Sequence, residues 1–185
     1  MSIEIVTPRL LLSSIDESHV DQVVDFVARN KTFLEAWEPA RTADYYTAEA
    51  QLQLIANDCL NMAREQLFKV WLYKKDDPTR IIGSIALNNI VRGVFQSCHL
   101  GYRIDEAENG KGFMTEGLTF VIEQAFHQLH LHRIEANIMP RNQASLRVVE
   151  KLGFSHEGLA RKYLKINGKW EDHIHMVLLN EELQD

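Results

Sequence analysis

The chain has 185 residues, 45% of them hydrophobic and 25% charged, and its 20 basic and 26 acidic side chains give a net charge of −6. This length fits one domain, residues 1–185, and the two cysteines cannot form a disulfide scaffold. We expect no membrane helix, because the apolar runs are short, and no signal peptide, because the N-terminus lacks a basic segment followed by an apolar one. We expect no direct nucleic-acid binding, because the net charge is negative. The expected setting is the cytoplasm, and the acidic balance leaves a cationic partner open.

The N-terminal third predicts one strand and two helices. Residues 9–14 form a short apolar run typical of a strand, and Asp16 can cap a helix in which valines recur at helical spacing. Residues 31–46 show no clear period and hold four aromatic side chains. Thr47 can cap a second helix, whose expected buried face consists of Leu52, Ile55, Ala56, Cys59 and Ala63.

Three strands are predicted next, over residues 67–75, 81–91 and 95–104, with turns at 76–79 and at Arg92-Gly93. A helix of about 17 residues is expected to begin at Gly112. Its expected buried face consists of Leu118, Ile122, Ala125 and Leu129.

The C-terminal part predicts a strand over 133–139, a short helix over 144–152 and a hairpin. The hairpin strands, 154–164 and 170–179, flank Asn167-Gly168, the strongest short hairpin signal. The order of elements predicts an α+β fold: one mixed, mostly antiparallel seven-stranded sheet with helices on both faces. A doubly wound sheet is excluded, because strands and helices do not alternate throughout.

A glycine-rich turn joins the strand ending near residue 104 to the helix at 112. Glycine lets the backbone turn sharply, and the first amides of a helix lack internal partners, so Gly110-Lys111-Gly112 can hold a phosphate. The dinucleotide fingerprint requires glycine at 115, where this chain has Thr115, and the P-loop pattern is absent. An ordinary turn entering a helix fits this segment equally well.

A second strand–helix junction, at 139–145, carries Asn142 and Ser145. If the strands before the two junctions are neighbours and splay apart, the gap makes a slot with polar groups at its mouth. Such a slot would suit a long ligand with a phosphorylated end. Taken alone, Asn142 is better explained as a helix cap.

These residues resemble the coenzyme-A motifs of the GCN5-related N-acetyltransferases, and the likeness covers essentially the whole chain. The general motifs are Thr7-Pro-Arg-Leu, Gly110-x-Gly112, Asn142-x-x-Ser145 and Leu152-Gly-Phe154. Four further segments resemble the RimJ branch, whose members acetylate the N-terminal alanine of a small-subunit ribosomal protein. They are Phe33-Leu-x-x-Trp37-Glu-Pro, Asn89-Ile-Val-Arg-Gly93, His99-Leu-Gly-Tyr102 and Gly168-Lys-Trp-x-Asp172-His.

The resemblance implies a binding site for acetyl-CoA. The strand at Leu100, Gly101 and Tyr102 would pair with the pantetheine arm, Asn142 would bind the same arm, and Ser145 would sit near the thioester sulfur. The diphosphate would be held by the amides of Gly110, Lys111, Gly112, Phe113, Met114 and Thr115. The chain departs from the family in having Ala107 where Gln or Arg is usual. It also has Val149 where many relatives have the tyrosine that protonates the thiolate, so Ser145 or a water would take that role.

The expected acceptor is an α-amine. At pH 7 a free α-amine of pKa near 8 costs about 1.4 kcal/mol to deprotonate, against about 4.6 kcal/mol for lysine. The base candidates are His99, Glu38 and Asp172, of which His99 is favoured as the catalytic group. Glu38 and Asp172, with Phe33 and Trp37 as an aromatic wall, are expected to bind the acceptor. Each also has a structural explanation. His99 can be an ordinary strand histidine, Glu38 a surface carboxylate, and Asp172 a residue that orders the hairpin. The aromatic side chains can simply pack a loop against the core.

The sequence therefore predicts an acetyl-CoA-dependent Nα-acetyltransferase that works by direct attack in a ternary complex. The expected acceptor is the N-terminus of a basic ribosomal protein, and the expected state is a monomer or homodimer. Acetylation of small amines or antibiotics, and a non-catalytic acyl-CoA-binding module, are the alternatives. We expect Cys98 to be a buried apolar residue rather than an acetyl carrier, and we expect no metal at His127, His130 and His132 or at His173 and His175.

Overall fold

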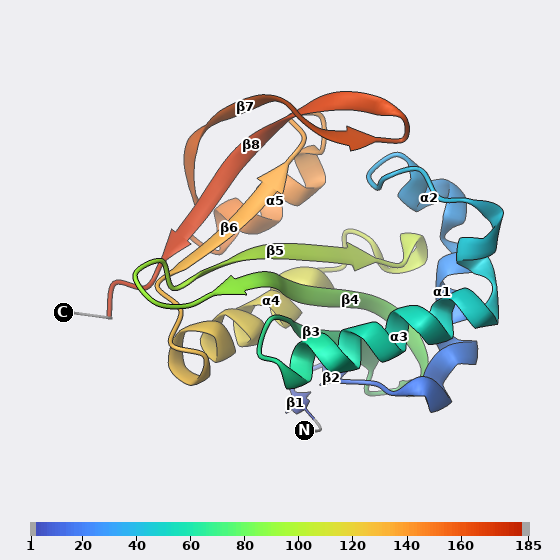
Figure 1. Ribbon diagram of the computed structural model, residues 1–185. Coiled ribbons are helices and arrows are strands. Elements are labelled where there is room, and N and C mark those ends of the chain that lie inside the picture. The colour runs from blue at the N-terminus through green and yellow to red at the C-terminus, as the bar shows by residue number, and fades with distance from the viewer. Residues whose placement is uncertain (1–2, 183–185) are drawn as a thin grey trace.

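The computed structural model describes residues 3–182 and has one mixed sheet in the order β1-β2-β3-β4-β5-β6-β8-β7 (Figure 1). The strands are β1 (Glu4–Val6), β2 (Leu10–Ser13), β3 (Phe68–Lys74), β4 (Asp77–Val91), β5 (Ser97–Ile104), β6 (Arg133–Ile138), β7 (Ser155–Ile166) and β8 (Lys169–Leu179). The helices are α1 (Val20–Arg29), α2 (Lys31–Glu35), α3 (Ala48–Ala63), α4 (Phe113–Glu123) and α5 (Gln143–Lys151). No helix within the described range is long and apolar enough to cross a membrane.

The sheet has eight strands rather than the seven predicted. The additional strand, β1, pairs antiparallel with β2 at the edge of the sheet. It contains three residues, Glu-Ile-Val, which is too short for a hydrophobic period to be recognised. The mixed character is confirmed, because β5 and β6 are the parallel pair in an otherwise antiparallel order.

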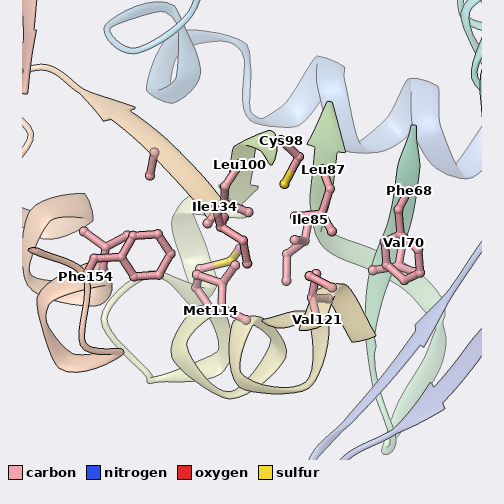
Figure 2. Packing of buried hydrophobic residues seen from close by; sticks show 14 of the residues in the cluster. Phe68, Val70, Ile85, Leu87, Cys98, Leu100, Met114, Val121, Ile134 and Phe154 are labelled. Atoms are coloured by element: carbon pink, nitrogen blue, oxygen red, sulfur yellow. The ribbon is translucent and has the colours of Figure 1, made fainter. Parts of the chain in front are cut away.

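Helices cover both faces of the sheet, as predicted. Along β3, Val70 and Leu72 pack in one hydrophobic cluster with residues of α4, while Trp71 and Tyr73 pack in another with residues of α1. This alternation follows from the period of two in a strand. Figure 2 shows Met114 and Val121 of α4 facing the strand residues of the first cluster.

The predicted buried face of the second helix is wrong in part. Helix α3 buries Gln51 and Ile55, while Leu52 is 37% exposed and Ala63 is also exposed. The side chain of Gln51 donates to the carbonyl of Tyr45, so a polar residue outside the predicted buried face is buried.

The predicted buried face of the helix after Gly112 is confirmed: Leu118 and Ala125 lie in the core, and Ile122 and Leu129 pack against it partly buried. This helix ends in a π-helical turn, Gln124–Gln128.

Several strand boundaries also differ from the prediction. Strand β4 begins at Asp77, so the turn before it is shorter than expected, and β5 begins at Ser97 because Phe95 is 54% exposed in the preceding loop. The C-terminal hairpin is confirmed, with its strands extended to the turn. Asn167 and Gly168 both adopt positive φ, 42° and 81°, as a tight hairpin turn requires.

Strands β5 and β6 separate soon after they meet, as Figure 1 shows. Their pairing ends with His99 opposite Glu135, while β5 continues to Ile104 beside β4, and β6 continues to Ile138 beside β8. Because α4 follows β5 and α5 follows β6, both helix N-termini lie at the open end of the gap. The predicted splay of neighbouring strands is therefore present.

Candidate active site

A cavity of about 300 Å³ lies in the gap between β5 and β6. Its walls come from β5, β6, α2 and the segment after it, the beginnings of α4 and α5, and one residue of β8. The lining includes most of the side chains that the sequence singled out: Leu100, Gly101, Tyr102, Met114, Asn142, Ser145, Phe33, Trp37 and Glu38. We call this space the strand cleft.

A second cavity, also about 300 Å³, continues from the strand cleft to the glycine turn. The two spaces share lining residues, among them Ile104, Asn109 and Met114. Gly110 and Gly112 adopt φ of +77° and +81°, so any other residue there would strain the backbone. Gly112 caps α4 without a side-chain hydrogen bond, which leaves the first amides of the helix available for an anion.

The segment Thr7-Pro-Arg fastens the glycine turn to the sheet. Arg9 Nε lies 2.6 Å from Glu116 Oε2 in the first turn of α4, and an Arg9 guanidinium nitrogen donates to the carbonyl of Lys111 at 3.1 Å. Thr7 Oγ1 donates to Glu116 at 2.6 Å. Although burial opposes it, these hydrogen bonds hold the pKa of Glu116 below its ordinary value. The carboxylate is therefore charged near neutral pH.

Two cations that the sequence did not single out line the same cavity. Arg147 and Lys151 are one helical turn apart on α5, on the wall opposite the glycine turn. Neither makes an ion pair with any residue in the range 3–182. Their spacing of four residues, which places both side chains on one face of a helix, is the sequence signal that could have identified them.

Asn142 and Ser145 form one polar unit at the start of α5. Asn142 Oδ1 accepts from the Ser145 amide at 3.2 Å, which confirms the helix-cap interpretation and leaves the Asn142 amide nitrogen for a ligand. Ser145 Oγ lies 2.5 Å from the Tyr102 hydroxyl, which also lies 3.1 Å from the Ser145 carbonyl. Burial raises the pKa of Tyr102 to about 12, so this hydroxyl stays protonated. Val149 is fully buried in the core and lies outside the cleft lining.

A third cavity of about 370 Å³ lies against residues 101–103 from the α3 side. Because residues 101–103 and Glu38 also line the strand cleft, the two spaces meet there. Arg103 donates to the Tyr45 hydroxyl at 3.1 Å and lies 3.5 Å from Glu38, whose other oxygen is 3.4 Å from Arg41. We call this third space the α3 groove.

His99 and Asp172 are not among the described residues that line the strand cleft. His99 sits at the last paired position of β5 and β6, with Nδ1 3.3 Å from Asn89 and Nε2 3.5 Å from Glu135. Asp172 Oδ1 accepts from the backbone amide of Lys162 at 2.7 Å, beside an irregularity in the β7–β8 pairing. Both side chains have structural partners outside the cleft.

His173, which the sequence left unassigned, does line the cleft. It is 3% exposed, and its Nδ1 lies 3.0 Å from the carbonyl of Glu171. Burial lowers its pKa, so the imidazole is neutral near pH 7. The sequence signal that could have identified His173 is its place directly after Asp172 in the RimJ-like segment. The sequence does not reveal which of these two side chains faces the cleft.

Cys98 lies in the hydrophobic core at 1% exposure (Figure 2). Burial raises its pKa to about 12, so the thiol is protonated and weakly nucleophilic. Residues 3–182 contain no group of three or more His, Cys, Asp or Glu side chains that could hold a metal ion.

Comparisons with known proteins agree with this geometry. A family model described as an acetyltransferase (GNAT) domain matches residues 9–155. A Bacillus subtilis protein named probable N-acetyltransferase YjcK is 40% identical over 168 residues, which cover 91% of this chain and 92% of that protein. The ribosomal protein uS5-alanine N-acetyltransferase of Escherichia coli is 37% identical over 175 residues, covering 93% and 88%. The crystal structure of a ribosomal-protein-S5-alanine acetyltransferase from Vibrio fischeri has a TM-score of 0.93 and 32% identity, covering 99% of this chain and 100% of that one.

The family match spans most of the chain, and the alignments with the two sequence relatives, over 168 and 175 residues, are longer than it. The strand cleft, the glycine turn and the amides at the start of α4 are the parts that an acyl thioester with a diphosphate needs. The chain therefore belongs to the GCN5-related N-acetyltransferase (GNAT) family and is an acetyl-CoA-dependent N-acetyltransferase.

Proposed function

We propose that this enzyme acetylates the N-terminal α-amine of a protein, with an alanine-starting small-subunit ribosomal protein as the preferred acceptor. The observation that carries the proposal is the meeting of the strand cleft and the α3 groove at residues 101–103. A thioester in the cleft and an acceptor chain in the groove would then face each other across β5. The similarity to the uS5-alanine acetyltransferase of Escherichia coli supports the choice of acceptor.

The donor would lie along the open edge of β5. Residues 100–104 have β4 as their partner on one side and no β6 pairing on the other, so backbone groups there are available to the pantetheine arm. The amides at the start of α4, from residues 112–115, would hold the diphosphate. Asn142 would donate from its free amide nitrogen, and Ser145 would sit near the sulfur.

The acceptor amine would reach the thioester at the junction of the two spaces. Gly101 has no side chain there, and a Cβ at this position would approach the Asn88 amide to 3.4 Å. Glu38 brings a carboxylate to the same junction, where it can bind an arriving ammonium group. Phe33 and Trp37 add an aromatic wall to the cleft, which suits a small first residue.

Direct attack in a ternary complex is favoured over a covalent acetyl-enzyme, because Cys98 is buried away from the cleft as a protonated thiol. We propose that residues 1–185 act as a single acetyltransferase domain in the cytoplasm, where a ribosomal protein would be met before or during assembly.

Intact-mass analysis after incubation with acetyl-CoA tests the acceptor. We expect one added acetyl group on peptides that begin with Ala or another small residue, and none on the same peptides with a blocked N-terminus and an internal lysine. Peptides that begin with a bulky residue should react at least tenfold more slowly. Preferential acetylation of polyamines or aminoglycosides would contradict the proposal, and tight acetyl-CoA binding without turnover on any amine would favour a binding module instead.

The Arg147→Ala/Lys151→Ala double variant should raise the KM for acetyl-CoA roughly tenfold and leave kcat nearly unchanged, because it removes charge that binds the donor equally in ground and transition states. Each charge-assisted contact to phosphate contributes about 0.7 kcal/mol in an exposed site, and the two together account for a factor of about ten. The KM difference should shrink at high salt. Arg64→Ala, an exposed cation at the end of α3, is the matched control. Equal KM values in the double variant and the wild type would show that these two residues do not bind the donor.

A further inference from the structure

The hydrogen bond of His173 fixes which of its nitrogens carries the proton. Nδ1 lies 3.0 Å from the carbonyl oxygen of Glu171. A carbonyl accepts and never donates, so Nδ1 must be the donor. In the neutral imidazole the lone pair then resides on Nε2. Nε2 makes no hydrogen bond with any residue in the range 3–182, and the side chain lines the strand cleft.

The surroundings keep this imidazole neutral near pH 7. Burial is the largest cause of the lowered pKa, and the nearby His175 acts in the same direction. The Glu171 carbonyl and the carboxylates of Glu171 and Asp172 act against it with smaller effect. Arg141 lies 3.7 Å from the Glu171 carboxylate and offsets part of that negative charge.

Groups on the neighbouring elements complete the charge environment. Tyr163 of β7 places its ring 5.6 Å from the His173 ring and 5.0 Å from that of His175. Glu38 and Arg103 line the same cleft and form an ion pair with each other at 3.5 Å. Because this carboxylate is already matched by Arg103 and Arg41, it adds little net charge near the imidazole.

From this placement we infer that His173 is the proton acceptor of the acetyl transfer, taking the proton of the attacking amine on Nε2. The inference rests on the proposed function, because it takes the acceptor to be an amine. The amine lone pair forms the C–N bond while the carbonyl π pair moves to oxygen. The nitrogen, now cationic and acidic, gives a proton to Nε2. When the C=O bond re-forms, the C–S bond breaks and the thiolate takes a proton from the Ser145 hydroxyl, which solvent restores.

The three carboxylate and imidazole groups that the sequence offered fit this role less well. Glu38 is held by two guanidinium groups, at 3.5 and 3.4 Å, so both of its carboxylate oxygens are already engaged. His99 and Asp172 are engaged outside the cleft. His173 is the imidazole that combines a place in the cleft lining with a lone pair free of protein partners.

His173→Asn is the sharpest variant, because the asparagine amide can replace the Nδ1–H donor to Glu171 while the accepting nitrogen is lost. We expect kcat to fall roughly 100-fold, with the acetyl-CoA Kd from calorimetry unchanged within about twofold. His175→Asn is the matched control: it removes an imidazole two residues along the same strand, where Nδ1 contacts Glu135 at 3.1 Å outside the cleft lining. This control should change kcat by less than about threefold.

The pH dependence separates proton acceptance from a structural role. For the wild type, log kcat/KM for the acceptor should fall with a slope approaching 2 at pH values below the lowered pKa of His173, since the amine and His173 must both be deprotonated. The variant should show a slope of about 1, from the amine alone. An unchanged slope, or equal losses of kcat in His173→Asn and His175→Asn, would overturn the assignment.

Nitrogen NMR of histidine-labelled wild-type enzyme provides a test that needs no acceptor. His173 should be neutral at pH 7, carry its proton on Nδ1 and titrate below pH 6.5. An Nε2–H tautomer, or a protonated ring at pH 7, would overturn the assignment even if the variant does not fold. If protein N-termini are not acetylated, the proposed acceptor fails, and the slope measured with whichever amine reacts still decides the role of His173.

Discussion

Replacing Ser145 with alanine should lower kcat about 100-fold while leaving the KM for acetyl-CoA within about twofold. Expelling a thiolate without a proton donor costs roughly 2.7 kcal/mol when general acid catalysis contributes a factor of 100. The Ser145 hydroxyl, at the beginning of α5, is the proposed donor, and Val149 cannot supply a proton because it is an aliphatic side chain in the core. Steady-state kinetics with a saturating peptide acceptor measure the effect.

Tyr102 should act through Ser145 rather than on the substrate. The Tyr102 hydroxyl has two acceptors on Ser145, the carbonyl at 3.1 Å and Oγ at 2.5 Å. When the tyrosine proton turns to Oγ, the serine proton is free to point into the cleft. We expect Tyr102→Phe to lower kcat about tenfold, and the double variant Tyr102→Phe/Ser145→Ala to be no slower than Ser145→Ala alone. Tyr73→Phe is the control, because it removes a buried hydroxyl from β3 that bonds to Gln22 on the other face of the sheet.

Two outcomes would contradict this assignment. Multiplicative losses in the double variant would mean that Tyr102 and Ser145 act independently. A Ser145→Ala enzyme with full kcat and a raised KM for acetyl-CoA would mean that the serine binds the donor instead of protonating its leaving group.

The architecture could be predicted because its signals are local. Apolar residues alternate in strands and recur every three or four residues in helices, and Asn167-Gly168 marks the hairpin turn. The errors arose where a local pattern carries little information. Strand β1 is too short to show a period, and Gln51 is buried because of a partner on another segment, the Tyr45 carbonyl.

The location of the site was predictable from the two strand–helix junctions, but its side-chain pairs were not. Tyr102 and Ser145 are 43 residues apart, and their contact depends on how α5 packs beside β5. His99 was favoured as the base because it lies close to Gly101 on the strand. The register shows that the strands part just after His99, and no local pattern marks that point.

The packing of α4 against the sheet should control both stability and donor binding. Gly117 is buried in this helix, and a Cβ there would lie 3.1 Å from Ile85 Cδ1 and 3.3 Å from Leu72 Cδ2. Gly117→Leu should therefore overpack the interface at a cost of about 3 kcal/mol. The better helix propensity of leucine returns about 1 kcal/mol. The free energy of unfolding should fall by about 2 kcal/mol, which urea denaturation measures.

The same substitution should raise the KM for acetyl-CoA, because pushing α4 away from the sheet displaces the amides next to Gly112 that are expected to hold the diphosphate. Thr119→Leu is the matched control: it adds leucine to the same helix at an exposed position, and should leave both stability and KM within experimental error. A Gly117→Leu enzyme that is destabilised yet keeps its KM would mean that Arg9 and Glu116 hold the glycine turn in place without help from the packing of α4.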